Sequence, residues 1–182
     1  KYDVKKDFFV NYYSGDGLQG NEFTHGAYYK DEDGKIYFGG INGITSFSPR
    51  KINTDAKELK VYITDFYVYS DPVHKNTLSD GTPIIFSSVQ DANIFQLSYR
   101  DNTFSIAFST LQYNNPEQIA YQYKIDELSN QWAVTEPGVN RVTYNNLFPG
   151  KYTFRVRALN HGNYSEVRTI KILIASPWYK TW

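Results

Sequence analysis

Apolar and polar residues alternate along most of the chain with the two-residue period of β-strands, and the 3.6-residue period of helices is nearly missing. The longest alternating segments are residues 61–69, 95–99, 103–110, 119–125, 141–145, 152–159 and 167–174. In three of them the apolar residues share one face: Phe104, Ile106 and Phe108; Tyr121, Tyr123 and Ile125; and Phe154, Val156 and Ala158. Seven such strands, separated by turn residues, predict a sandwich of two β-sheets.

The first 50 residues carry shorter strands. Alternation is limited to residues 35–40 and 44–47, and the pairs Asp33-Gly34 and Asn42-Gly43 stand beside these segments. Both pairs favour hairpins with type I′ turns, in which two central residues need a positive φ. We therefore predict about four short strands in residues 1–50, which is the content of one blade of a β-propeller.

A polar stretch that contains a proline, residues 48–55, separates the two patterns. Such a stretch is typical of a boundary between domains. The predicted organisation is all-β, with residues 1–54 as the C-terminal fragment of a propeller and residues 55–182 as a β-sandwich.

Composition narrows the possible functions. The chain has 17 Tyr, 12 Phe and 3 Trp, and such aromatic residues favour half-buried pleated surfaces. The 19 basic residues are balanced by 19 acidic ones, which argues against a nucleic-acid partner. The absence of cysteine leaves neither a disulfide framework nor thiolate chemistry. No apolar run reaches the roughly 18 residues that a membrane-spanning helix needs.

The chain ends in Ser176-Pro177-Trp178-Tyr179-Lys180-Thr181-Trp182. Trp, Tyr and Lys are the residues that settle at the interface between a bilayer and water. One interpretation is that a transmembrane helix follows directly, which makes Trp178, Tyr179 and Trp182 membrane-proximal. The other is that Trp178 and Trp182 cover the end of the sandwich.

Residues that could carry chemistry do not form a recognisable site. The three histidines, His25, His74 and His161, lack the spacing of metal ligands. The acidic run Asp31-Glu32-Asp33-Gly34 lacks the remaining ligands of an EF-hand and is better explained as a hairpin turn. Neither Ser98 nor Ser109 lies in a nucleophile elbow, and the glycines at residues 39–43 precede a strand rather than a helix. We therefore predict no catalytic, cofactor or metal site and no enzymatic activity.

One segment indicates the type of sandwich. Residues 147–158 read Leu-Phe-Pro-Gly-Lys-Tyr-Thr-Phe-Arg-Val-Arg-Ala, which resembles the entry to the sixth strand of fibronectin type III domains. In those domains the tyrosine hydroxyl bonds to the backbone upstream and holds the corner of the sandwich. The resemblance gives this structural role to Tyr152.

Longer stretches resemble the sensor region of hybrid two-component systems in Bacteroides-type bacteria. Asn21–Ala27 and Asp33–Pro49 are similar to the last propeller blade of these sensors. Leu97–Ser109, Tyr121–Ile125, Asn130–Trp132, Arg141–Leu147 and the corner at Tyr152 are similar to the Y_Y_Y domain that follows the propellers. The resemblance implies structural roles for Tyr121, Tyr123, Trp132 and Tyr144, and it places Tyr164 where the family often has Trp.

The resemblance implies a periplasmic module of an inner-membrane-anchored sensor, between propellers and a transmembrane helix, with a histidine kinase in the complete protein. It also implies a homodimer with a second copy, and a glycan ligand held by propellers outside this chain. Our leading hypothesis is thus a non-catalytic signal-transmission and dimerisation module. Two alternatives stay open: a carbohydrate-binding module that uses tyrosines such as Tyr67, Tyr69 or Tyr113, and an accessory domain of a glycoside hydrolase.

Overall fold

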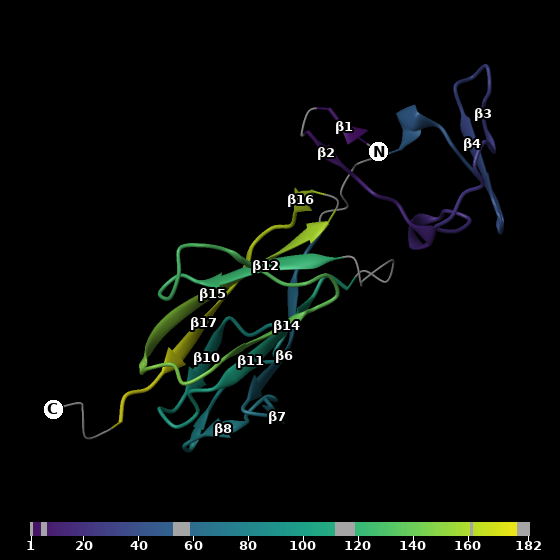
Figure 1. Ribbon diagram of the computed structural model, residues 1–182. Helices are drawn as coiled ribbons and strands as arrows, with labels where there is room; N and C mark the ends of the chain where they lie inside the picture. The colour runs from purple at the N-terminus through teal and green to yellow at the C-terminus, as the bar shows by residue number, and fades with distance from the viewer. Residues whose placement is uncertain (1, 5–6, 53–58, 112–118, 161, 178–182) are drawn as a thin grey trace. The chain divides into compact units, whose positions relative to one another are not determined.

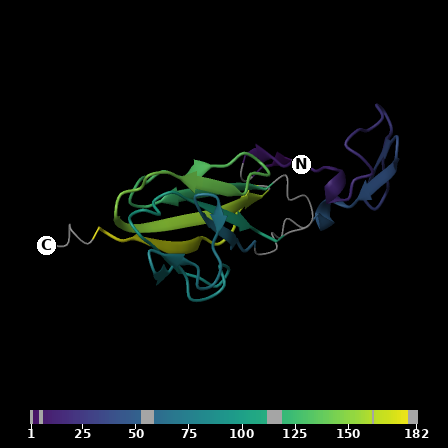
Figure 2. The same ribbon diagram turned by 90° about the horizontal axis from the view of Figure 1, so that it is seen from below.

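The computed structural model describes residues 2–4, 7–52, 59–111, 119–160 and 162–177. Its regular structure consists of β-strands and two short 3-10 helices, η1 and η2. The chain forms two compact units, one mainly from residues 1–57 and one mainly from residues 58–182. Figures 1 and 2 show the strands of the second unit arranged in two layers. The predicted boundary after residue 54 lies outside the described residues and stays a prediction.

The first unit contains a small antiparallel sheet. Its strands are β3 (Tyr28–Lys30), β4 (Ile36–Gly40) and β5 (Gly43–Phe47), in that order. The strands β1 (Tyr2–Asp3) and β2 (Phe8–Phe9) pair only with each other, and the 3-10 helices are η1 (Ser14–Asp16) and η2 (Pro49–Lys51). The described part of residues 1–50 thus has five short strands, three in one sheet and two in another, where the sequence predicted about four.

Both hairpins of this sheet differ from the predicted type I′ turn. Between β3 and β4 the carbonyl of Asp31 accepts the N–H of Gly34, and only Gly34 of the predicted pair has a positive φ, of 81°. Between β4 and β5 the register pairs Gly40 with Gly43, so Ile41 and Asn42 form the connection. Neither has a positive φ, whereas Gly43 has a φ of 133°. The glycines supply the unusual backbone angle after the turn rather than at its centre.

The second unit is a sandwich of two sheets. The larger sheet has the order β10-β17-β15-β12-β13, with β16 beside β15, and the smaller one has the order β14-β11-β6-β7. The strands of the larger sheet are β10 (Ile94–Leu97), β17 (Arg168–Ile174), β15 (Gly150–Asn160), β12 (Ala120–Ile125), β13 (Ala133–Val134) and β16 (Asn163–Tyr164). Those of the smaller are β14 (Arg141–Tyr144), β11 (Phe104–Ser109), β6 (Tyr62–Val68) and β7 (Asp71–Pro72). A separate hairpin joins β8 (Leu78–Ser79) to β9 (Thr82–Pro83).

The seven long strands predicted from alternation are all present, with ends shifted by at most a few residues. Their arrangement is the immunoglobulin and fibronectin III-like one, with β6, β11 and β14 in one layer and β13, β12, β15 and β17 in the other. The pairing of β10 with β17 is parallel, whereas β11 with β14, β11 with β6, β12 with β13, β12 with β15, β15 with β17 and β6 with β7 are antiparallel. The predicted fold class is confirmed.

Aromatic rings fill the space between the two sheets. Phe66 lies between Phe95, at a ring distance of 4.3 Å, and Phe104, at 5.4 Å, and all three side chains are fully buried. Phe108 packs on Phe154 at 6.3 Å. The three predicted apolar faces point into this core, although Tyr123 is only partly buried. The core joins residues far apart in the sequence into one rigid body.

The corner of the sandwich forms at Tyr152. Its ring is buried, and its hydroxyl donates a hydrogen bond of 2.8 Å to the carbonyl oxygen of Phe148. The turn before β15 is thereby held by a side chain of that strand. This is the geometry of the tyrosine corner in fibronectin type III domains.

Replacing Tyr152 by Phe removes this hydrogen bond and keeps the ring. We expect Tyr152→Phe to lower the free energy of unfolding by about 1 kcal/mol, the usual net contribution of one such bond. Urea unfolding with a constant m-value measures the change. Tyr164→Phe, at an exposed ring, is the control and should leave the midpoint unchanged. Equal effects of the two variants would contradict a specific role of the corner bond.

Candidate functional site

A stack of aromatic and cationic side chains lies on the outer face of the larger sheet. The guanidinium carbon of Arg157 lies 4.5 Å from the ring centre of Trp132 and 4.0 Å from that of Tyr164. Its Nε and Nη2 donate to the side-chain oxygen of Gln122, at 2.9 and 2.7 Å. The ammonium of Lys124 lies 5.4 Å from the Trp132 ring. These contacts connect β12, β15 and β16 with the start of β13 through cation–π attraction.

An ion-pair cluster lies next to this stack. The carboxylate of Asp126 is 2.8 Å from the ammonium of Lys124 and 2.6 Å from Nε of Arg155. The hydrogen bond from Lys124, followed by that from Arg155, holds the pKa of Asp126 below its ordinary value of 3.8. The cluster joins the end of β12 to β15, so these two strands are linked by ion pairs on their outer face.

The lowered pKa of Asp126 gives a pH-dependent prediction. Ionised Asp126 stabilises the fold above the unfolded-state pKa, and this contribution disappears as the pH falls through the lower folded-state pKa. Asp126→Asn should therefore be less stable than the wild type at neutral pH, with a difference that shrinks as the pH falls below about 4. Thermal unfolding of both proteins at several pH values measures this. A difference that stays constant across the acid range would contradict the assignment.

The tyrosines singled out from the sequence occupy different environments. Tyr121 is buried edge-on against Phe108 at 4.9 Å, and Tyr123 packs against the core from the same strand. Tyr144 is half-buried and lies 5.7 Å from Phe104. Burial, and secondarily Tyr123, raises the pKa of Tyr144, so its phenol stays neutral well above pH 7. These residues pack in or against the core, Tyr152 holds the corner, and Trp132 belongs to the outer stack.

The strand nearest the C-terminus is held in the middle of the larger sheet. Residues 168–174 of β17 pair with residues 150–156 of β15, and residues 171–174 pair with β10 on the other side. After the strand, the N–H of Ala175 donates a hydrogen bond of 2.8 Å to the carbonyl oxygen of Leu97, and Pro177 is buried. The predicted membrane-proximal residues Trp178, Tyr179 and Trp182 lie outside the described residues. Among the residues that are described, no helix is long and apolar enough to cross a membrane.

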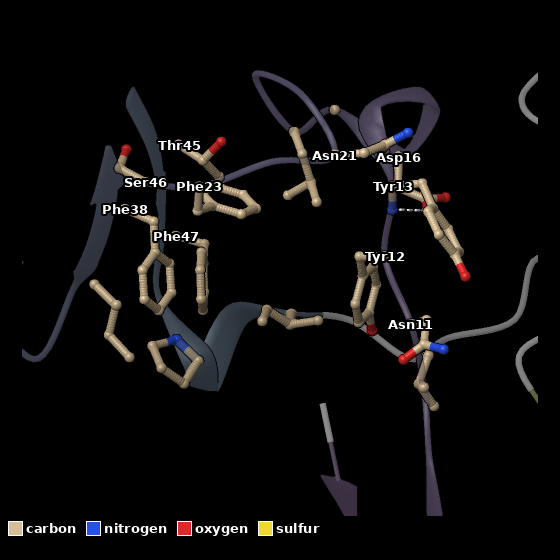
Figure 3. Close-up of a pocket in the computed structure, with 16 residues that line it drawn as sticks. Asn11, Tyr12, Tyr13, Asp16, Asn21, Phe23, Phe38, Thr45, Ser46 and Phe47 are labelled. Carbon is tan, nitrogen blue, oxygen red and sulfur yellow. Dashed lines mark hydrogen bonds between the residues drawn. The ribbon is translucent and has the colours of Figure 1, made fainter. Parts of the chain in front are cut away.

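A pocket of about 770 Å³ opens in the first unit. Figure 3 shows Phe23, Phe38 and Phe47 on one side of it, with Tyr12 and Asn11 on the other. Phe38 stacks on Phe47 at 5.9 Å. Burial raises the pKa of Tyr12, and the negative charge of Asp16 raises it further, so this phenol stays neutral. A lining of aromatic rings with a few polar groups suits a neutral ligand that has apolar faces.

The tyrosines considered for sugar stacking do not form a platform in the described structure. Tyr67 is covered on one ring face by the guanidinium of Arg141, 4.0 Å from the ring centre. Tyr69 is 53% exposed, and its hydroxyl donates a hydrogen bond of 2.6 Å to the carbonyl oxygen of Arg100. Tyr113 lies outside the described residues. The two described tyrosines therefore belong to separate contacts.

The residues considered for catalysis or metal binding have ordinary surroundings. His25 and His74 are exposed, and His161 lies outside the described residues. The carboxylate of Asp31 accepts the N–H of Lys35 at 2.8 Å, as expected of a hairpin turn. Within the described ranges, no group of three or more His, Asp or Glu side chains is arranged to hold a metal ion.

Sequence reasoning missed two groups of polar residues. One is Arg157 with Gln122, whose partners come from several strands. The other is Asp101, whose carboxylate accepts hydrogen bonds from the hydroxyls of Ser79 and Ser98. Ser98 had been considered only as a nucleophile. The first group depends on the strand register, and the second on the approach of Ser79, 19 residues upstream of Ser98; a single sequence carries no direct signal for either.

Known proteins share this architecture. Residues 112–175 match the Y_Y_Y domain family. Histidine kinase P4 of Formosa agariphila is 26% identical over 185 residues, which cover the whole chain but only 13% of that protein. The extracellular domain of the hybrid two-component system BT3049 from B. thetaiotaomicron is 27% identical with a TM-score of 0.72, and the match covers 96% of this chain and 23% of that one.

A further structure supports the fold. The extracellular domain of BT4673 from B. thetaiotaomicron has a TM-score of 0.59 at 24% identity, and the match covers 84% of this chain and 20% of that one. The chain thus spans less than a quarter of each relative. The resemblance to the sensor regions of Bacteroides hybrid two-component systems is confirmed, including the Y_Y_Y domain.

Proposed function

We propose that this chain is a non-catalytic transmission and dimerisation module in the periplasmic part of a hybrid two-component sensor histidine kinase that responds to glycan fragments. The similarity to extracellular domains of such systems and to a histidine kinase supports the sensor role. We further propose that residues 178–182 lead into a membrane anchor, and that propellers outside this chain hold the ligand.

The position of β17 is the observation that carries the proposal. A strand paired along both edges cannot slide without breaking two ladders of backbone hydrogen bonds. The fully buried Phe66, Phe95 and Phe104 fill the space between the sheets, and close-packed interiors deform little. A displacement of the sandwich is therefore passed as a rigid-body movement to the segment after Ile174. The differential free energy needed to switch a two-state dimer is only a few kcal/mol.

The transmission role is tested in the complete sensor. Residues 59–175 are replaced by a flexible linker rich in Gly and Ser of similar length, and ligand-dependent transcription is measured with a reporter gene. We expect the response to be lost while membrane insertion and protein level are kept. A sensor that still switches normally would overturn the proposal, because transmission would then need no rigid body at this position.

The dimerisation role is tested on the isolated chain. Sedimentation equilibrium over a concentration series should show a weak monomer–dimer equilibrium. A monomer at all concentrations would contradict dimerisation by this segment and would leave assembly to the rest of the sensor. The transmission experiment in the complete sensor stays informative in either case.

The carbohydrate-binding alternative is separated by calorimetry with a panel of oligosaccharides. The proposal expects no binding tighter than about millimolar, a weak interaction near −4 kcal/mol. The Arg141 contact on Tyr67 supports this expectation because one face of that ring is not available to a sugar. Micromolar binding that depends on Tyr69 would favour a binding module instead.

A further inference from the structure

Three loops are bonded together at the end of the sandwich where β15 begins and β17 ends, which we call the C-terminal end (Figure 1). They comprise residues 69–70, 98–103 and 145–149. The N–H of Tyr69 donates a hydrogen bond of 2.9 Å to the carbonyl oxygen of Thr103. The N–H of Leu147 donates one of 3.0 Å to the carbonyl oxygen of Asn102. The N–H of Asn146 bonds to the hydroxyl of Thr103 at 3.1 Å. The three loops therefore form one rigid surface.

Tyr69 adopts an unusual backbone conformation on this surface. Its φ is 54°, in the left-handed region that a bulky residue rarely occupies. The hydrogen bonds to Thr103 and Arg100 hold it there, and its side chain remains 53% exposed. This backbone conformation costs conformational free energy. Because the structure nevertheless holds Tyr69 in it with the aromatic ring at the surface, we infer that the ring has a function.

Among the described residues of the second unit, Phe148 has the most exposed large apolar side chain, at 82%. It is presented by a rigid turn, because Tyr152 bonds to its carbonyl and Leu147 beside it packs against the core. Fully exposing a phenylalanine costs transfer free energy without any benefit to this fold. The packing of the sandwich therefore does not explain Phe148.

The charges around these aromatic residues leave a nearly neutral surface. Arg100 and Lys151 are exposed, and Arg100 bonds to the hydroxyl of Tyr99 at 3.0 Å. Several acids at this end are engaged within the fold: Asp101 with two serines, Asp126 with Lys124 and Arg155, and Glu127 with Thr153. Asp71 and Asp80 are exposed and offset the two cations. Attraction to this surface must therefore come from its aromatic rings rather than from net charge.

We propose that the C-terminal end docks on the surface of a lipid bilayer, with Phe148 inserted among the acyl chains and Tyr69 and Tyr99 at the level of the head groups. Tyrosine and basic side chains are the ones that settle at this interface. In the sequence, a segment rich in Trp and Tyr, residues 178–182, follows the strand that ends here, and such residues are typical of a bilayer interface. This inference rests on the proposed membrane-proximal position of the chain and adds that the domain itself contacts the lipid.

The test measures co-flotation of the chain with unilamellar vesicles of phosphatidylethanolamine and phosphatidylglycerol. Phe148→Ser should lower the partition coefficient roughly tenfold, because an aromatic side chain that inserts into the bilayer is replaced by a polar one. Phe148→Trp should keep or raise it. Binding should persist near 1 M salt, where the Debye length is about 3 Å, because it does not depend on charge.

The matched control is Phe86→Ser, which removes another exposed phenylalanine, 64% exposed, from a segment of the same unit outside these loops. It should leave the partition coefficient unchanged. Equal losses for Phe86→Ser and Phe148→Ser, an unchanged coefficient for Phe148→Ser, or no flotation of the wild type would each overturn the proposal. Circular dichroism verifies that all variants fold. The replacement experiment in the complete sensor reads transmission and not lipid contact, so failures of the two proposals are distinguishable.

Discussion

Phe66→Ala is expected to lower the free energy of unfolding of the sandwich by about 3–5 kcal/mol. The Phe66 ring is fully buried between Phe95 and Phe104, so its removal leaves a cavity that neighbouring rings of both sheets line. The lost transfer free energy and the unfilled cavity both contribute. The expected loss is a large part of the total stability of a domain of this size.

Urea unfolding followed by circular dichroism measures this change, with the m-value as a check on the unfolding reaction. Phe86→Ala is the matched control, because the same ring is removed from an exposed position. It should change the stability by no more than about 0.5 kcal/mol. A loss below about 1 kcal/mol for Phe66→Ala would mean that the core collapses around the gap, which conflicts with a rigid transmission body.

Asp101→Ala is expected to lower the stability by about 1–3 kcal/mol. The Asp101 carboxylate accepts hydrogen bonds from the hydroxyls of Ser79 and Ser98, and both serines are buried. The hydroxyl of Ser79 in turn accepts the N–H of Ser98 at 2.7 Å. Without the carboxylate, two buried hydroxyls lose their acceptor, and the cost of leaving them unpaired exceeds that of one ordinary bond.

The chain offers a matched comparison for this prediction. Asp91 accepts a hydrogen bond of 2.6 Å from the hydroxyl of Ser88, and both residues are exposed. Asp91→Ala should therefore cost less than about 0.5 kcal/mol, since water replaces the lost partner. Thermal unfolding of both variants compares them directly. Similar shifts for Asp91→Ala and Asp101→Ala would show that burial of the serines does not determine the cost.

The long strands were predictable because each has one face in the core. Phe104, Ile106 and Phe108 must all point inward, and this need leaves a two-residue period in the sequence. The strands β7, β8, β9, β13 and β16 were missed, because each has only two residues and no period. The turn after β4 was predicted one residue too late, because Asn42-Gly43 favours a type I′ turn whereas the register makes Ile41 and Asn42 the connection and Gly43 the first residue of β5.

Side-chain clusters were the least predictable part. Arg157 contacts Trp132, Tyr164 and Gln122, which lie up to 35 residues away along the chain. The pairing of Gln122 with Arg157 across β12 and β15, together with the pairings of β13 with β12 and of β16 with β15, brings them together. The tyrosine corner was accessible because its residues are near neighbours in sequence. Local motifs thus carry over from sequence to structure, whereas contacts between strands require the register.

The parallel pairing of β17 with β10 has a consequence for biogenesis. Of the strands that the structure describes, β17 is the latest in the chain, yet it lies between β10 and β15 in the larger sheet. Until residues 168–174 have left the ribosome, β10 has no partner in that sheet and one edge of β15 is open. Contacts between such distant segments form slowly, and exposed apolar strands promote aggregation in the meantime. We therefore expect the larger sheet of this unit to fold only once almost its full length is available.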